Sequence, residues 1–266
     1  MKKFLIILST LTLGCNTGKL TVVGDIPAEL KEASAIELGA SGDILWTIED
    51  SGNKRRLYGI DTMARIKNDI KVLNAKNIDW EDLTSDDQGN IYIGDFGNNS
   101  KKRSKFTIYK ISSDDFNLDE TEAEKIKFSL PEDHKTKDFE AFFLYDEHFY
   151  VFSKEHKKFI VLKVPNIPGE HKAELISEFN LEGKNNKITA ADIREDGKEV
   201  LLLNHDKLWR LTDFSGDDFF SGKIEALMFD HNSQKEGLCY KSNNEVYIVD
   251  EKSKSGGGNL YRFKLR

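Results

Sequence analysis

The feature that most constrains this chain is a block of roughly 50 residues that recurs along it. The blocks open with similar short segments: "KEASAIEL", "WEDLTSD", "FEAFFLY", "ITAADIR" and "KEGLCYK". One reference residue in each opening marks the repeat: Glu32, Glu81, Glu140, Thr189 and Glu236. Successive reference residues are 49, 59, 49 and 47 positions apart. A regular spacing of this kind indicates one supersecondary unit used five times.

Each block has the pattern of four short β-strands. A turn signal and a second β-type run follow each opening, as in "GDILWTIED" and "GNIYIGDFG". A third run repeats an apolar, aromatic, variable, apolar order in four blocks, for example Leu57–Ile60 and Leu260–Phe263, and an aliphatic version occurs at Val161–Val164. Short strands also occur in sandwiches and open solenoids, but four strands in about 50 residues favour the blade of a β-propeller.

The two ends of the chain complement each other. The last block stops at Arg266 after its third strand, whereas Lys19–Asp25 ("KLTVVGD") has the character of the missing fourth strand. We therefore predict an all-β, five-bladed β-propeller of four-stranded blades, closed by an N-terminal strand that joins the last blade. The 59-residue spacing is assigned to a loop extension at 112–124, and six blades are the alternative if that segment hides a further block.

The N-terminus resembles a bacterial lipoprotein signal. Met1–Lys3 is positively charged, Phe4–Leu13 is apolar but too short to span a bilayer, and Cys15 follows Gly14. The match departs from the usual pattern at Thr12, where leucine is common, so export without lipidation is the alternative.

This interpretation divides the chain into a signal peptide (1–14), a lipidated tether (15–18) and the propeller domain (19–266). We expect Cys15 to carry the lipid and to be the contact with the membrane. The protein is then an exported, lipid-anchored monomer of the bacterial cell envelope, on the periplasmic or outer-membrane face. The only other cysteine, Cys239, lies among apolar residues and is expected in the core.

Composition narrows the class of partner. Hydrophobic residues make up 38% of the chain and aromatic residues 11%, which is enough to build a core. The formal net charge is −7, so a nucleic-acid partner is disfavoured, because binding to phosphates depends on clustered lysine and arginine. Cationic partners fit this charge better.

The acidic residues of the blocks are predicted to meet at one end of the central channel. The first two strands of a blade are antiparallel, so the start of one lies beside the end of the next. This places Glu81 beside Asp95, and Glu140 beside Ser153 and Lys154. Because inner strands line the channel, we expect a shared mouth with these metal ligands: Glu32, Asp50, Glu81, Asp95, Glu140, Glu236 and Asp250.

Ca²⁺ is the cofactor expected at such a mouth. Carboxylates brought close together raise one another's pKa unless a cation compensates, and Ca²⁺ takes six to eight oxygen ligands. Further ligand-binding candidates at the same end are Trp80, Lys154, Asn204 and His205. Structural roles are the alternative: aspartates that cap turns, glutamates that bond the adjacent blade, a core tryptophan, and a histidine that is only hydrogen-bonded.

Motifs for catalysis are absent from the sequence. It contains no Gly-x-Ser-x-Gly elbow, no phosphate-binding Gly-x-x-x-x-Gly-Lys loop and no His-Glu-x-x-His pair, so no catalytic residue is assigned. The basic segment "SKKRSK", 100–105, is expected to be a solvated loop.

Three segments carry a family resemblance: "LWTIEDSGNKRRLYGID", "NIDWEDLTSDDQGNIYIGDFGNN" and "ITAADIREDGKEVLL". They resemble exported bacterial β-propellers related to the SdiA-regulated and phytase-like groups. The resemblance implies a propeller with a metal-occupied acidic mouth and extends a metal or ligand role to Glu32, Asp50, Glu81, Asp95 and Glu236. Thr189, and Ser153 or Lys154, depart from a complete acidic ring.

Two functions follow as expectations. The first is a binding module that presents its acidic mouth, with or without Ca²⁺, to a small-molecule or protein ligand. The alternative is a metal-dependent hydrolase of ester, lactone or phosphoester bonds, in which the ion activates water and an acid or His205 transfers protons. Binding is preferred because a fold alone does not specify an activity.

Overall fold

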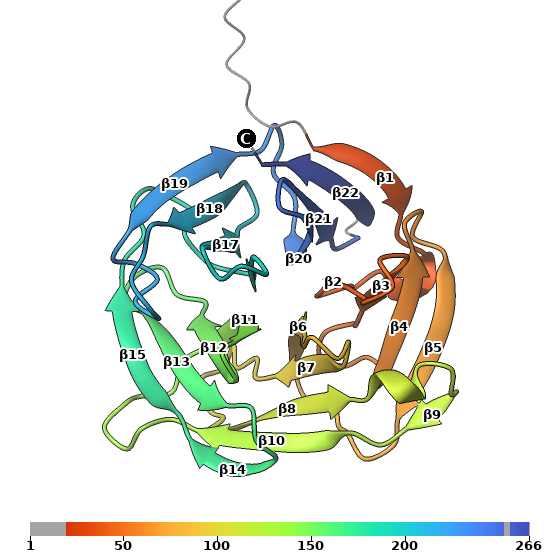
Figure 1. Ribbon diagram of the computed structural model, residues 1–266, viewed down its shortest axis with the longest axis horizontal. Helices are drawn as coiled ribbons and strands as arrows, with labels where there is room; N and C mark the ends of the chain where they lie inside the picture. The colour runs from red at the N-terminus through yellow and green to blue at the C-terminus, as the bar shows by residue number, and fades with distance from the viewer. Residues whose placement is uncertain (1–19, 253–255, 266) are drawn as a thin grey trace, which may run out of the picture.

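The computed structural model describes residues 20–252 and 256–265 and consists of five β-sheets around a central channel (Figure 1). It is the predicted five-bladed β-propeller. The proposed signal peptide 1–14, Cys15 and the tether 15–18 lie outside the described residues. Within the described residues, no helix is long and apolar enough to cross a membrane.

Each blade consists of four antiparallel strands, numbered here from the channel outward. Blade 1 contains β2 (Glu37–Leu38), β3 (Ile44–Thr47), β4 (Arg56–Asp61) and β5 (Ile66–Val72). Blade 2 contains β6 (Trp80–Ser85), β7 (Ile91–Asp95), β8 (Lys105–Ile111) and β10 (Glu124–Ser129). Blade 3 contains β11 (Phe139–Tyr145), β12 (His148–Ser153), β13 (Phe159–Pro165) and β15 (Glu174–Phe179). Blade 4 contains β16 (Ala190–Ile193), β17 (Glu199–Leu203), β18 (Lys207–Thr212) and β19 (Lys223–Met228). Blade 5 contains β20 (Lys235–Ser242), β21 (Glu245–Asp250), β22 (Asn259–Lys264) and β1 (Thr21–Asp25).

The ring closes through blade 5, as the sequence predicts. The N-terminal strand β1 pairs antiparallel with β22, so the first strand in the chain is the outermost strand of the last blade. This pairing covers the edge that the C-terminal strand would otherwise leave open.

Two short strands extend the outer edges of blades 1 and 2. The segment predicted as a loop extension contains a 3-10 turn (Ser113–Asp115) and β9 (Glu120–Thr121), which pairs parallel with β5 of the preceding blade. In the same way β14 (Gly169–Lys172) leaves blade 3 and pairs parallel with β10 of blade 2. The extension therefore attaches one blade to its neighbour and forms no sixth blade.

The hydrophobic core is divided among the five interfaces between neighbouring blades, with one cluster of buried side chains in each. The interface of blades 2 and 3 is the most aromatic: Phe142 packs edge-on against Phe96 at 5.2 Å, and Phe106 contacts Phe139 at 5.4 Å between ring centres. Edge-to-face aromatic pairs add to the stabilisation that burial gives. Cys239 lies buried in the interface of blades 5 and 1.

Side chains on the inner strands join blades through backbone groups. The buried carboxylate of Asp82 on β6 accepts hydrogen bonds from the backbone N–H of Phe142 in the neighbouring blade 3 (3.1 Å) and of Ala191 in blade 4 (3.3 Å). Asp192 on β16 accepts one from the N–H of Tyr240 at 2.7 Å. Hydrogen bonding between blades was the structural alternative considered for the glutamates, and here it is made by Asp82 and Asp192.

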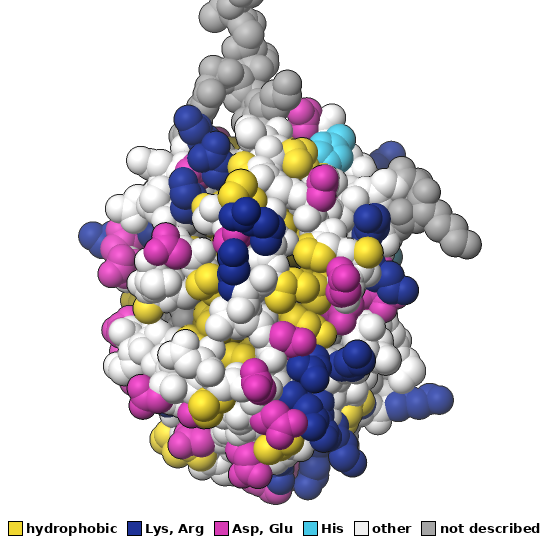
Figure 2. Space-filling view, turned by 90° about the vertical axis from the view of Figure 1, so that its right-hand side faces the viewer, with side chains coloured by type: hydrophobic (Ala, Val, Ile, Leu, Met, Phe, Trp, Pro, Cys, Tyr) yellow, Lys and Arg dark blue, Asp and Glu magenta, His cyan; other side chains and the backbone are white. Residues whose placement is uncertain are grey.

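The rim of the propeller is mixed in character. On the side that carries β4, β5 and β9, lysine and arginine side chains alternate with aspartate and glutamate, and smaller hydrophobic areas lie between them (Figure 2). Mixed charge of this kind is typical of a solvated surface.

Candidate functional site

Three of the predicted glutamates occupy equivalent β-bulges at one end of the channel. In blade 2 the register between β6 and β7 shifts between Trp80 and Asp82, so Glu81 is the additional residue. The same shift surrounds Glu140 in blade 3 and Glu236 in blade 5. A bulge interrupts the alternation of a strand and redirects a side chain. This geometry brings residues from distant parts of the chain to one opening.

Hydroxyl side chains occupy the equivalent position in the other two blades. Ser34 in blade 1 donates a hydrogen bond to the carbonyl of Trp80 (3.1 Å), and Thr189 in blade 4 donates one to the carbonyl of Lys235 (2.7 Å). Ser34 is therefore the residue equivalent to Glu81, and the predicted alignment of Glu32 with Glu81 was wrong by two residues. Glu32 still lies at the same opening, because its carbonyl accepts a hydrogen bond from the N–H of Asp50 at 3.2 Å.

Among the described residues, a group of carboxylates interacts at this opening, which we call the acidic mouth: Glu32, Asp50, Asp79, Glu81, Asp138, Glu140, Glu236 and Glu251. Sequence reasoning missed three of them, Asp79, Asp138 and Glu251. The signal was in the repeat, because Asp79 and Asp138 each precede a bulge glutamate by two residues and Glu251 directly follows Asp250.

A glycine allows two of these carboxylates to approach the backbone. A Cβ atom on Gly97 would overlap the carboxylate oxygen of Glu81 and the carboxyl group of Asp79. Gly97 thus provides the space in which both side chains lie, and its N–H donates to the carbonyl of Asp79 at 3.1 Å.

Burial and mutual repulsion raise the pKa values of carboxyl groups in the acidic mouth. The pKa of Glu81 lies well above its usual range, because the group is buried and because Glu140 and Asp79 are negatively charged neighbours. Burial, with Glu236 and Asp138, raises the pKa of Glu140 to about 7. Burial and the charge of Glu32 raise the pKa of Asp50 to about 7. These shifts indicate negative charge that the protein only partly compensates.

Lys154 and His205 lie within the acidic mouth. The ammonium group of Lys154 lies 2.7 Å from the carboxylate of Glu140. Burial would lower the pKa of Lys154, but the charges of Glu140 and Glu236 outweigh burial and raise it above its usual value. His205 Nε2 lies 3.2 Å from Glu236 Oε1, and its side chain is 36% exposed. Both residues are therefore positioned to contact a group that enters the mouth.

The residues at the ends of the second strands bond to their own loops instead. Asp95 is fully buried and forms an ion pair with Arg103 at 3.0 Å. Asp250 accepts hydrogen bonds from the N–H of Asn259 (2.7 Å) and the hydroxyl of Tyr261 (2.8 Å). Asn204 accepts one from the N–H of Asp206 at 3.1 Å. These contacts favour a structural role for Asp95, Asp250 and Asn204.

Two further expectations need correction. Trp80 is fully buried, its indole N–H donates to the carbonyl of Lys76 at 3.0 Å, and it packs near Tyr109, so it belongs to the core and offers no surface for stacking. Arg103, in the basic segment expected to be solvated, has only 18% of its side chain exposed because it neutralises Asp95. A lone buried carboxylate required this partner.

The donor atoms of the acidic mouth suit a hard cation, but their arrangement does not form a metal centre. Over 20–252 and 256–265, no group of three or more His, Cys, Asp or Glu side chains is arranged to hold a metal ion. Lys154 also lies against Glu140, one of the carboxylates that Ca²⁺ would need. The residues as placed therefore do not fit a resident Ca²⁺ ion.

No protein-family model and no curated protein matches this chain. Solved structures do resemble it. One is a gluconolactonase from Xanthomonas campestris, with a TM-score of 0.51 and 9% identity, which covers 88% of this chain and 72% of the other. Another is the PQQ-bound aldose sugar dehydrogenase from Streptomyces coelicolor, with a TM-score of 0.53 and 9% identity, which covers 93% of this chain and 98% of the other. At this identity the likeness concerns the propeller fold alone, and the resemblance to the SdiA-regulated and phytase-like groups stays a prediction.

Proposed function

We propose that this chain is a non-catalytic binding module of the bacterial cell envelope, anchored through a lipid on Cys15, whose acidic mouth binds a cationic group of a ligand or partner protein. Ca²⁺ is one candidate for that cation, although it would have to rearrange the side chains of the mouth. The anchor rests on the N-terminal sequence pattern.

One observation supports the binding role above the others. The carboxylates of the acidic mouth outnumber their bases: within the described residues, the basic groups in contact with them are Lys154 and His205, together with Lys31 at 3.8 Å from Glu32. Carboxylates that serve only structure are normally paired with a base or with backbone N–H groups, as Asp95 and Asp250 are here. The excess negative charge at the opening instead favours an external cation.

Calorimetric titration with CaCl₂, and separately with tri-lysine, tests this proposal. We expect at least one probe to bind the propeller domain, and the double variant Glu81→Gln/Glu140→Gln to weaken that binding by about 30-fold or more. The matched control Glu174→Gln/Glu178→Gln removes two exposed carboxylates from β15 and should bind as the parent does. Failure of both probes to bind, or equal binding by the two double variants, would refute the proposal.

A metal-dependent lactone or ester hydrolase is the second candidate. The contact between His205 and Glu236 favours it, since a carboxylate can orient a histidine that accepts a proton from water. The fold it shares with a gluconolactonase is compatible with it. Hydrolysis of glucono-δ-lactone or p-nitrophenyl acetate that requires added Ca²⁺ and is lost in His205→Ala would establish this function. No turnover above that of the His205→Ala variant would exclude it for these substrates.

A further inference from the structure

The opposite end of the channel contains a cavity of about 830 Å³. Its rim is formed by the hairpins that join the first and second strands of all five blades, so it lies at the end remote from the acidic mouth. Small-molecule sites usually have volumes of about 300 to 1,000 Å³, and they occur in the openings of such barrels. The cavity therefore has the size of a site for an organic molecule.

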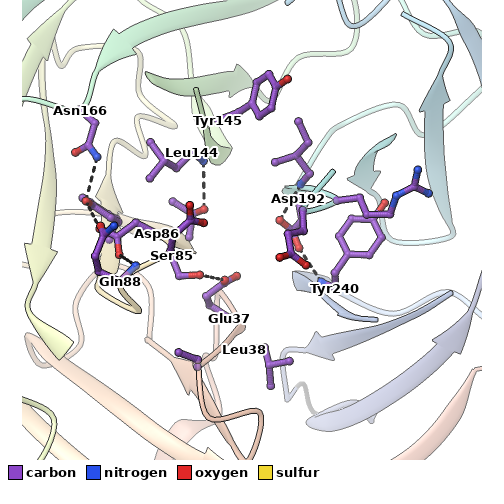
Figure 3. A pocket seen from close by; sticks show the side chains of 18 of the residues that line it. Glu37, Leu38, Ser85, Asp86, Gln88, Leu144, Tyr145, Asn166, Asp192 and Tyr240 are labelled. Atoms are coloured by element: carbon purple, nitrogen blue, oxygen red, sulfur yellow. Dashed lines mark hydrogen bonds between the residues drawn. The ribbon is translucent and has the colours of Figure 1, made fainter. Parts of the chain in front are cut away.

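Two carboxyl groups lie inside this cavity, below the hairpin turns. Glu37 on β2 and Asp192 on β16 come from facing walls, and both point toward the interior (Figure 3). Burial, and the charge of Asp192, raise the pKa of Glu37 well above its usual range. Burial raises the pKa of Asp192 to about 7. The protein thus holds two carboxyl groups at a place where ionising both is unfavourable.

The two carboxyl groups differ in how many hydrogen bonds they accept from the protein. Asp192 accepts backbone hydrogen bonds from Ile193 and Tyr240, both at 2.7 Å, one on each oxygen. Glu37 accepts one from the hydroxyl of Ser85 at 2.6 Å on Oε1. Among the described residues Oε2 of Glu37 has no hydrogen-bond partner, although this residue is only 9% exposed. That free oxygen opens into the cavity (Figure 3).

The basic side chains around the cavity are already paired with other acids. Arg194 contacts Asp196 at 2.8 Å and Glu199 at 3.0 Å. Lys241 contacts Glu245 at 2.6 Å. Lys110 lies 3.9 Å from Asp86. Within the described part of the chain, neither Glu37 nor Asp192 forms a salt bridge with a base. Their compensating charge has to come from outside the protein or from bound protons.

From this arrangement we propose that the cavity is a second binding site, specific for a small organic cation such as a primary amine or a guanidine, whose charged group pairs with Glu37 Oε2 and faces Asp192. A bare metal ion fits less well, because both oxygens of Asp192 already accept backbone hydrogen bonds and Ca²⁺ needs six to eight oxygen ligands. The wall offers further polar partners for the body of the ligand, including the amide of Gln88 and the side chain of Asn166.

Binding is expected to be linked to release of a proton. The cation pairs with an ionised carboxylate, so affinity should increase with pH as Asp192, whose pKa is raised to about 7, and Glu37, whose pKa is raised well above its usual range, lose their protons. The titratable groups packed around Glu37 are Asp192, Asp82 and the thiol of Cys239, and they add no positive charge.

The test compares putrescine with 1,4-butanediol, which has the same length but hydroxyl groups in place of the ammonium groups. Titration calorimetry of the wild-type propeller domain should detect putrescine binding that strengthens from about pH 6 to about pH 8, with proton release between buffers of different ionisation enthalpy. The diol should bind far more weakly. Glu37→Gln should weaken putrescine binding by about 30-fold, and this variant should fold because it removes an uncompensated buried charge.

The matched control is Glu174→Gln, which makes the same change at an exposed carboxylate of β15 and should leave putrescine binding unchanged. Binding of CaCl₂ and tri-lysine by Glu37→Gln reports the proposed function separately, so one proposal can fail while the other stands. Equal affinity for the diol, equal putrescine binding by Glu37→Gln, or no putrescine binding at concentrations of about 1 mM would overturn the cavity proposal. The comparison of charged putrescine with the uncharged diol uses only the wild-type protein, so it stays decisive if the variant does not fold.

Discussion

At the scale of single residues, the channel contains carboxyl groups that are buried, although their ionised form is more stable in water. Glu81 and Glu140 at the acidic mouth, and Glu37 in the cavity, are nearly inaccessible, and burial is the main reason that their pKa values are raised. Such groups cost stability when ionised unless something compensates them. A protein that retains them against this cost is using them to bind or to organise something else.

Glu140 gives a prediction about pH. Its pKa is raised from 4.5 to about 7, so the folded state binds more protons than the unfolded state between these values, and the ionised carboxyl group destabilises the fold as pH rises through that range. We expect the free energy of unfolding of Glu140→Gln, relative to that of the wild type, to increase by about 2 kcal/mol as the pH is raised from about 5 to about 8 in the absence of added cations. Denaturant unfolding at each pH measures this difference.

The control for this measurement is Glu122→Gln, which removes an exposed carboxylate. Its stability relative to wild type should change little over the same range. If the difference in unfolding free energy between Glu140→Gln and the wild type does not change with pH, the buried carboxyl group of Glu140 is not the source of the pH dependence.

At the scale of strands and blades, local patterns were enough to predict the elements. The aromatic third-strand motif identifies β4, β8, β18 and β22, and the aliphatic version identifies β13, because the alternation of a half-buried strand is a property of adjacent residues. The β-bulges and the shift of the first repeat to Ser34 depend on which residues of two strands pair. Parallel pairing of β9 with β5 depends on contact with another blade. Neither the bulges nor the pairing of β9 is visible in a short stretch of sequence, so sequence reasoning could expect the glutamates to meet at one opening but could not find Asp79, Asp138 and Glu251 beside them.

The aromatic interface of blades 2 and 3 gives a prediction at this scale. Phe142 is fully buried and packs against Phe96 and Phe149. Phe142→Ala should lower the free energy of unfolding by about 3 to 5 kcal/mol, since it leaves a cavity between two blades. The control Leu118→Ala changes a side chain that is 51% exposed and should alter stability by less than about 0.5 kcal/mol. Chemical denaturation measures both, and similar values for the two variants would contradict the packing described.

At the scale of the whole molecule, closure holds the channel together. The five interfaces form a ring that supports each blade on both sides, and the pairing of β1 with β22 completes the last blade of that ring. The convergence of carboxylates from four blades depends on that ring, because the strands that carry them have no direct pairing with one another.

Deletion of the chain up to Asp25 removes β1 and tests this dependence. We expect the melting temperature to fall by about 10 °C or more, and the exposed edge of β22 to promote self-association. Deletion of residues 1–18 only is the control and should leave both properties unchanged. Thermal unfolding together with light scattering after size exclusion measures them. An unchanged melting temperature after loss of β1 would mean that the remaining strands close the ring without it.

The position of β1 also determines how the molecule would sit on a bilayer. The strand lies at the outer edge of blade 5 and begins at Thr21. A fatty-acyl chain on Cys15 would therefore be joined to the circumference of the propeller by a short tether. Such an attachment would lie away from both ends of the channel. The anchor itself would then leave the acidic mouth and the cavity open to solutes in the aqueous phase.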